Sequence, residues 1–253
     1  MAPAPKSKSD QVLAIDIGAT SIKFCRIDPF GALLEVPQRR PTPYPCSPER
    51  LVEFLRQKVS RSRCSRVGVG FPGKFEHGHV VRPGNLSRPG GVTTEVDPEL
   101  DERWRGFGLE DALRSATGRD VRVVNDATLA ALGCCEGDGV EVVLTLGTGL
   151  GLALEVNGVL TPVRDVGAEL FVEGRTYDQV LGERPRSDDQ DRWQHMLELA
   201  IARFAKEFDA TTVHLAGGNA RRVAPNLLTA VPCRVVINGN EAPLHGAAKL
   251  FYT

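Results

Sequence analysis

The sequence contains one construction twice, and this repeat constrains the fold more than any other feature. Residues 12–28 begin with an apolar run that ends in Asp16, turn through Gly18-Ala19-Thr20 and resume an alternating apolar pattern. Residues 142–156 repeat the order of strand, glycine-rich turn and strand. Apolar runs on both sides of a small-residue turn predict two β-hairpins. The chain is therefore expected to form two related halves, each opened by a hairpin.

Both turns carry residue types that bind phosphate. A glycine such as Gly18 allows a positive φ or a close approach of the backbone to a ligand, while Thr20 offers a hydroxyl and Lys23 an ammonium. Exposed backbone N–H groups beside such side chains form an anion cradle. A plain hairpin is the alternative for either turn taken alone. The spacing does not fit a P-loop, and the apolar strand after Gly151 does not fit the dinucleotide-binding fingerprint.

The composition is that of a soluble globular protein. Its 253 residues are 42% hydrophobic and 25% charged, and the net charge of −1 gives no reason to expect nucleic acid or membrane as a partner. No apolar stretch approaches the ~20 residues that span a bilayer. The six cysteines include no Cys-x-x-Cys pair and the five histidines no ligand spacing, so we expect reduced thiols and a cytoplasmic protein. Residues 1–10 are expected to be a disordered tail.

The order of the remaining elements predicts an α/β protein of two lobes with a cleft between them. We expect residues 11–124 to form the first lobe and residues 125–240 the second. A last helix at about 241–253 could pack back on the first lobe, and the sequence does not decide this. We expect strands at 31–38, 66–71, 121–124, 211–216 and 235–237, and helices at 48–59, 109–116, 127–133, 193–204 and 242–251. Residues 74–104 are expected to form a long loop or small hairpin, and residues 176–191 an exposed segment.

Asp126 is the strongest candidate for a catalytic group. It follows a strand and begins a helix, so Asn125 or Asp126 could equally be a plain helix N-cap. A hydroxyl that attacks a phosphoryl group needs a carboxylate to accept its proton. Asp126 would accept that proton, and Asn125 would hold the hydroxyls of the acceptor.

Two further positions could hold the phosphoryl donor. Asp16, beside the first turn, could bind Mg²⁺ directly or through water. Gly217 and Gly218 follow a strand, where the lack of side chains would let a flat nucleobase lie against the backbone. A plain tight turn is the alternative for these two glycines.

The motifs, taken in order, resemble those of the ROK (repressor, open reading frame, kinase) sugar kinases. They are Asp16-x-Gly18-x-Thr20-x-x-Lys23, Gly70-Phe71-Pro72-Gly73, Asn125-Asp126-Ala127, Leu146-Gly147-Thr148-Gly149-x-Gly151 and Ala216-Gly217-Gly218-Asn219. The resemblance covers nearly the whole chain after the tail and is greatest to bacterial glucokinases, including polyphosphate-dependent ones. It implies the two-lobed actin-like ATPase fold, which is ribonuclease H-like, with the active site in the interlobe cleft.

The resemblance also implies roles for individual residues. It implies phosphate contacts at Gly18, Thr20, Lys23, Thr148, Gly149 and Gly151, and nucleotide contacts at Gly217 and Gly218. It implies sugar contacts at Asn85, Asn125, Asp126 and Glu169, with Asp126 as the catalytic aspartate.

Three departures from the family pattern concern the sugar and the metal. The family usually follows its glutamate with Gly-His, whereas Glu169-Leu170 continues into Phe171-Val172, so one sugar ligand is missing and Glu173 is a doubtful substitute. The cysteine-rich zinc motif is absent, so we expect no structural zinc. Residues 88–103 resemble an insertion near the expected sugar site.

Residues 39–88 are strongly basic, with eleven Lys and Arg against three Glu. A solvated face is the ordinary explanation. A track for polyphosphate is the more specific one, because a polymer with many charges needs several cations.

The sequence therefore predicts a Mg²⁺-dependent sugar kinase. It would transfer a phosphoryl group from ATP or polyphosphate to the 6-hydroxyl of glucose or a related hexose. The alternatives are a non-catalytic sugar or nucleotide sensor of the same fold and a kinase for a different hydroxyl acceptor. A DNA-binding role is not expected, since no helix-turn-helix segment precedes the first hairpin, and a homodimer is expected from the resemblance.

Overall fold

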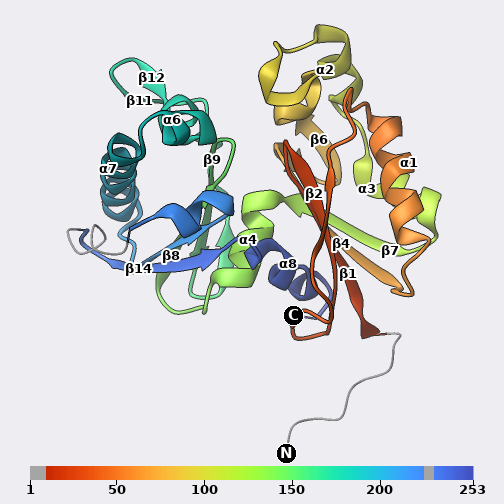
Figure 1. Ribbon diagram of the computed structural model, residues 1–253. Helices are drawn as coiled ribbons and strands as arrows, with labels where there is room; N and C mark the ends of the chain where they lie inside the picture. The colour runs from red at the N-terminus through yellow and green to blue at the C-terminus, as the bar shows by residue number, and fades with distance from the viewer. Residues whose placement is uncertain (1–9, 225–230, 253) are drawn as a thin grey trace, which may run out of the picture. The chain divides into compact units, whose positions relative to one another are not determined.

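The computed structural model describes residues 10–224 and 231–252, so the expected disordered tail lies outside the described residues except for Asp10. The chain forms two compact units (Figure 1). The first unit comprises the chain up to residue 129 together with residues 243–253, and the second comprises residues 130–242.

A five-stranded mixed sheet forms the centre of the first unit. In order across the sheet, its strands are β3 (Gln38–Pro41), β2 (Ser21–Ile27), β1 (Val12–Ile17), β4 (Arg66–Phe71) and β7 (Asp120–Asn125). The strands β1 and β2 pair antiparallel, which confirms the first predicted hairpin, while β4 and β7 continue the sheet in parallel. All six residues of β1 are buried, so this strand lies at the centre of the core.

Two helices of the first unit, α1 and α3, lie where the sequence predicts. Helix α1 (Pro48–Val59) begins after Ser47, whose hydroxyl accepts a hydrogen bond from the Arg50 N–H. Helix α3 (Leu109–Thr117) ends at Gly118, which adopts the left-handed conformation that favours glycine. The apolar faces of both helices join the core of this sheet.

The last residues of the chain return to the first unit. Helix α8 (Ala242–Gly246) is followed by the 3₁₀ helix η6 (Ala247–Leu250), where one continuous helix was expected. A β-carbon on Gly68 would lie 2.9 Å from that of Ala247, so η6 packs directly on β4.

Residues 74–104 are more ordered than the sequence predicts. The expected hairpin is present as β5 (Lys74–Glu76) and β6 (His79–Arg82). The 3₁₀ helices η2 (Gly84–Ser87) and η3 (Gly91–Thr93) and the helix α2 (Pro98–Trp104) follow it. Asp97 caps α2, and the buried Trp104 indole donates to the Cys46 carbonyl over 2.8 Å. The segment resembling an insertion is thereby tied to the core.

The second unit repeats the arrangement of the first sheet. In order, its strands are β10 (Val159–Thr161), β9 (Leu150–Val156), β8 (Val140–Leu146), β13 (Thr212–Ala216) and β14 (Arg234–Gly239). The antiparallel pair β8–β9 is the second predicted hairpin, and β13 and β14 extend it in parallel. The turn at Asn157 and Gly158, both with positive φ, joins β9 to β10.

One long helix and several short elements complete the second unit. Helix α7 (Gln190–Phe208) places Trp193, Leu197, Ile201 and Phe204 in the core, as its apolar periodicity predicts. The pair β11 (Leu170–Val172) and β12 (Arg175–Thr176) leads into α5 (Tyr177–Leu181) and α6 (Glu183–Asp188). The 3₁₀ helix η4 (Gly218–Arg222) follows β13.

Two sequence-based expectations were wrong in detail. The third strand is β3 at Gln38–Pro41, later than the expected 31–38, and it is an exposed edge strand without an alternating apolar pattern. The expected exposed segment 176–191 contains α5, in which Tyr177, Val180 and Leu181 are buried. Stacking of Phe171 on Tyr177, with ring centroids 4.3 Å apart, explains this burial.

Two further observations bear on the expected environment. Across residues 10–224 and 231–252, every helix is too short or too polar to cross a bilayer. All six cysteines are free thiols in the structure.

Candidate active site

The expected helix N-cap is present at Asn125. Its Oδ1 accepts hydrogen bonds from the N–H groups of Ala127 (2.9 Å) and Thr128 (3.3 Å), which begins α4 (Asp126–Cys134). Its Nδ2 donates to the Gly73 carbonyl over 2.7 Å. Asn125 therefore joins the end of β7 to the Pro72-Gly73 turn and fixes the first residue of the helix.

Asp126 follows as the first residue of α4, with its carboxylate next to a second acidic side chain. Its Oδ1 accepts the Ala127 N–H over 2.8 Å. Burial, and after it repulsion from the Asp16 carboxylate, raises the pKa of Asp126 to about 7, against the opposing effects of backbone hydrogen bonds and of Lys23. Near neutral pH this carboxyl group can both accept and release a proton, as a general base requires.

Asp16 and Lys23 form an ion pair beside Asp126. The Lys23 Nζ lies 2.6 Å from the Asp16 Oδ2, and both side chains are almost buried. The two residues are direct partners in the β1–β2 register. The hairpin pairs Asp16 with Lys23, and the sheet that β1 shares with β7 brings Asp126 close to both.

The first turn is held in place from its carbonyl side. Thr42 Oγ1 donates to the Gly18 carbonyl and Tyr44 Oη to the Ala19 carbonyl, each over 2.7 Å. Among the described residues, no hydrogen bond uses the N–H of Ala19 or Thr20, so these donors can meet an anion. Gly18 does not have a positive φ; a β-carbon there would lie 3.0 Å from the Ser21 carbonyl oxygen, and this close approach accounts for the glycine.

Tyr44 is a residue that the sequence analysis missed. Its hydroxyl contacts the carbonyl of Ala19 and, at 3.4 Å, that of Asn85 on η2. It therefore links the first turn to the segment expected to bind the sugar. Burial raises the pKa of Tyr44 to about 12, which keeps the hydroxyl a donor. An aromatic residue between two prolines in a connecting segment was the only sequence signal for it.

In the second unit, Asp178 of α5 fixes the second glycine turn. The Gly147 N–H bonds to the Gly149 carbonyl over 3.1 Å, and the Leu150 N–H donates to Asp178 Oδ1 over 2.8 Å. A β-carbon on Gly149 would clash with the Asp178 carboxylate. The described hydrogen bonds leave the N–H groups of Thr148 and Gly149 unused.

The third glycine turn packs on the second. Gly217 has a φ of 90°, and a β-carbon on it would clash with the Leu146 carbonyl oxygen. The buried Asn219 donates from Nδ2 to the Gly147 carbonyl over 3.1 Å. Apart from its neighbours in the chain, no described residue has an atom within 4 Å of a β-carbon added to Gly218. The second unit therefore assembles Thr148, Gly149, Gly217 and Gly218 into one place, and Gly151 follows in β9 opposite Thr145.

Glu169 belongs to a different group in the second unit. Its carboxylate pairs with Arg164 at 2.9 Å, and Arg164 also pairs with Glu207 of α7. Glu173, the doubtful substitute for a sugar ligand, is exposed and pairs with Arg175 and Arg192. Arg164 and Glu207 gave no signal in the sequence because the pairing of Arg164 with Glu169 and Glu207 depends on the fold.

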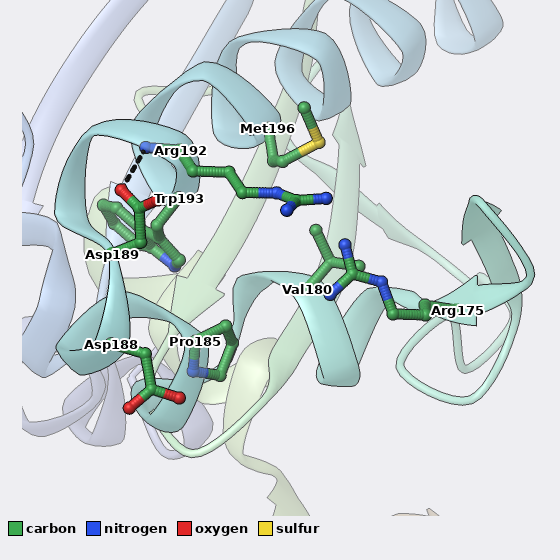
Figure 2. Close-up of a pocket in the computed structure, with 8 residues that line it drawn as sticks. All are labelled: Arg175, Val180, Pro185, Asp188, Asp189, Arg192, Trp193 and Met196. Carbon is green, nitrogen blue, oxygen red and sulfur yellow. Dashed lines mark hydrogen bonds between the residues drawn. The ribbon is translucent and has the colours of Figure 1, made fainter.

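A small cavity of about 180 Å³ lies where α5, α6 and α7 meet. Figure 2 shows Arg175 and Arg192 turned toward one another across Val180. Both guanidinium groups already pair with Glu173. None of the predicted site residues lines this cavity, so we do not assign the active site to it.

The two sheets, each opened by an antiparallel hairpin and extended by parallel strands, define the actin-like ATPase fold that ROK sugar kinases share. A profile of the ROK family matches residues 12–162. The chain belongs to the ROK family.

Named relatives include two kinds of sugar kinase. The polyphosphate glucokinase of Mycobacterium leprae strain TN is 29% identical in an alignment of 191 positions that covers 71% of this chain and 52% of that protein. The glucokinase of Halalkalibacterium halodurans is 27% identical in an alignment of 174 positions that covers 62% of this chain and 48% of that protein. The chain spans about half the length of these curated relatives.

Solved structures resemble the chain over nearly its whole length. The inorganic polyphosphate/ATP-glucomannokinase of Arthrobacter sp. strain KM is 29% identical with a TM-score of 0.80, covering 96% of this chain and 98% of that one. A ROK glucokinase of Streptomyces griseus, in complex with glucose and AMPPNP, is 19% identical with a TM-score of 0.72, covering 95% and 98%. The second likeness shows the fold alone.

Proposed function

We propose that the chain is a sugar kinase. It transfers a phosphoryl group from ATP or polyphosphate to the 6-hydroxyl of glucose or a related hexose. The names of the relatives support glucose or a related hexose as the acceptor and ATP or polyphosphate as the donor, while the choice of the 6-hydroxyl is part of the proposal. The observation that carries the proposal is the Asp126 carboxyl group, whose pKa of about 7 suits a general base.

In this proposal the acceptor hydroxyl binds at Asp126. As its oxygen forms a bond to the terminal phosphorus of the donor, the bond from phosphorus to the leaving phosphate oxygen breaks. The hydroxyl proton moves to Asp126. The N–H of Asn125 Nδ2 that does not bond Gly73, together with Asn85, orients the sugar, and exclusion of water limits hydrolysis of the donor.

In the first unit, the unused N–H groups of Ala19 and Thr20, together with the Thr20 hydroxyl and Lys23, would bind phosphate of the donor. In the second unit, the unused N–H groups of Thr148 and Gly149 would also bind phosphate. The glycine turn at Gly217 and Gly218 would accept the base of a nucleotide donor. These roles follow from the N–H groups at Thr148 and Gly149 and from the open space at Gly218.

The residues near Asp126 fit a Mg²⁺ ion. Asp16 supplies a carboxylate oxygen beyond the one that pairs with Lys23, and two neighbouring carboxylates favour a divalent cation. Asp16 would hold the ion directly or through water. When Mg²⁺ is bound together with the donor, it would neutralise part of the negative charge on the donor phosphates.

A kinase for a different hydroxyl acceptor is the second candidate. The ion pair of Glu169 with Arg164, which also pairs with Glu207, favours it. A carboxylate engaged in this way offers less to a sugar hydroxyl, and the family histidine after it is absent.

The test is phosphoryl transfer to glucose with Mg²⁺, run in parallel with ATP and with polyphosphate. A panel of other hexoses, amino sugars and simple alcohols is assayed beside glucose. Phosphorylated glucose or a related hexose with either donor is the expected result and identifies the donor. Product only from a non-hexose acceptor would favour the second candidate, and a folded protein that binds sugar or nucleotide without forming product would be a sensor.

A further inference from the structure

A cluster of three buried side chains lies in the second unit, and the proposed reaction does not use it. It consists of Cys135, which follows α4, Glu141 on β8 and His214 on β13. One thiol, one carboxylate oxygen and one imidazole nitrogen lie within 4.8 Å of one another. Glu141 is at the start of β8, whereas the glycine turn follows its end, so the cluster and the turn lie at opposite ends of this strand.

Neighbouring groups hold two of these side chains in fixed orientations. Glu141 Oε1 accepts the backbone N–H groups of Glu136, Gly137 and Asp138 at 2.8–3.1 Å. Its other oxygen, Oε2, lies 2.8 Å from His214 Nε2. The Asn238 amide contacts His214 Nδ1 at 2.9 Å. Such outer contacts orient the carboxylate and imidazole ligands of metal sites.

A second buried acid adds negative charge at the same place. Glu155 on β9 is the direct partner of Glu141 in the antiparallel register, so both side chains lie on one face of the sheet. Like charges in this position repel one another. Both carboxylates also contribute to the raised pKa of the Cys135 thiol, after burial as the largest cause. A divalent cation would neutralise this charge.

We propose that Cys135, Glu141 and His214 bind a divalent metal ion of the Zn²⁺ class, at a site separate from the proposed active site. A thiolate, an imidazole and a carboxylate are the ligand types that bind Zn²⁺ in proteins. Water would complete a tetrahedral set, with Glu155 as a nearby counter-charge. The ion would join the end of α4, β8 and β13.

Binding of the metal ion by these three side chains can be written with charges and protons accounted for. Cys135 loses its thiol proton to solvent, and His214 binds through an unprotonated Nε2 while Nδ1–H donates to the amide oxygen of Asn238. This hydrogen bond requires that the Asn238 side-chain amide is turned by 180°, so that its oxygen instead of its nitrogen faces His214 Nδ1. Thiolate and carboxylate together supply the two negative charges that match the ion.

This site differs from the zinc motif that the sequence lacks. We expected no structural zinc because the cysteine-rich family motif is missing, and the histidines showed no ligand spacing. The three proposed ligands are separated by up to 79 positions, from 135 to 214, so only the pairing of β8 with β13 brings them together.

The test is a Co²⁺ titration of the full chain after treatment with a chelator. Co²⁺ is the probe because a bound thiolate gives it a charge-transfer absorption band. We expect a band that saturates at one Co²⁺ per chain and disappears on addition of excess Zn²⁺. It should be lost in Cys135→Ser and weakened in His214→Asn.

The matched control is Cys233→Ser, which changes another cysteine of the second unit that lies outside the cluster. Its band should equal that of the unaltered chain. No band from the folded chain, or a band that persists in a folded Cys135→Ser variant, would overturn the proposal and leave a hydrogen-bonded cluster. If Cys135→Ser does not fold, the Co²⁺ band of the unaltered chain and its weakening in His214→Asn still test the proposal.

Discussion

Asp126 shows how one residue can serve function at a cost in stability. Its carboxyl group is held near Asp16, and its pKa is raised to about 7. Ionisation at neutral pH is therefore unfavourable in the folded chain relative to the unfolded one. The same property makes Asp126 a competent base, so its two effects can be measured separately.

The first prediction concerns the pH dependence of the rate. A base with a pKa of about 7 must be deprotonated to accept the hydroxyl proton. We expect kcat/KM for the sugar to rise with pH, by about tenfold per unit well below 7, and to level off above it. A profile that is flat between about pH 5.5 and 8.5 would contradict the role of this pKa.

The second prediction concerns stability. Because the folded pKa of Asp126 lies above its unfolded value, the carboxyl group loses favourable free energy as pH rises from about 4 to about 7. Asn cannot ionise, so Asp126→Asn should unfold at a higher temperature than the unaltered chain above pH 7, by roughly 2–4 °C per kcal/mol gained. The difference should disappear near pH 4. Thermal unfolding at both pH values checks this, and a destabilised variant at pH 8 would refute it.

At the scale of helices and strands, the sequence correctly predicted the elements that have a strong local pattern. The hairpins, α1, α3 and α7 follow from alternation, capping and helical periodicity. Strand β3 was misplaced because an exposed edge has no apolar alternation. The burial of Tyr177 and the contacts of Asp178 depend on packing between distant segments. The same reason explains why Tyr44 and the pairing of Glu169 with Arg164 could not be predicted.

The third prediction separates two neighbouring glycines. Gly217 needs its positive φ, and a β-carbon there would clash with the Leu146 carbonyl, so Gly217→Ala should lower the unfolding temperature by several degrees. Gly218→Ala has open space and should leave the unfolding temperature unchanged while weakening ATP binding. Thermal unfolding and ATP titration test both. Equal destabilisation by the two substitutions would show that this account of the turn is wrong.

At the scale of the whole molecule, charge is unevenly distributed along a nearly neutral chain. In the first unit, burial lowers the pKa of Lys58 and repulsion from Arg40 and Arg61 lowers it further, so the three cations lie close to one another. We call Arg40, Lys58 and Arg61 the basic cluster. Arg105 and Arg114 each pair with an acid four positions earlier in the chain, Asp101 and Glu110, whereas this cluster concentrates positive charge. Such a cluster would attract a polyanion more than a single nucleotide.

The fourth prediction follows from the basic cluster. Arg40→Gln with Arg61→Gln should raise KM for polyphosphate about tenfold, because charge-assisted contacts are lost, and should leave KM for ATP nearly unchanged. Arg105→Gln with Arg114→Gln removes the same charge elsewhere and serves as the control. If both pairs affect polyphosphate equally, the cluster is an ordinary solvated surface.

The most direct test of the central claim is the turnover of Asp126→Asn with the sugar and donor on which the unaltered chain is active. Asp120→Asn, which changes an exposed acid at the start of β7, the strand that precedes Asp126, is the matched control. We predict that Asp126→Asn stays folded and loses about 10²–10⁴-fold in kcat, while Asp120→Asn retains full turnover. Near-normal turnover in folded Asp126→Asn would contradict the assignment of Asp126 as the base.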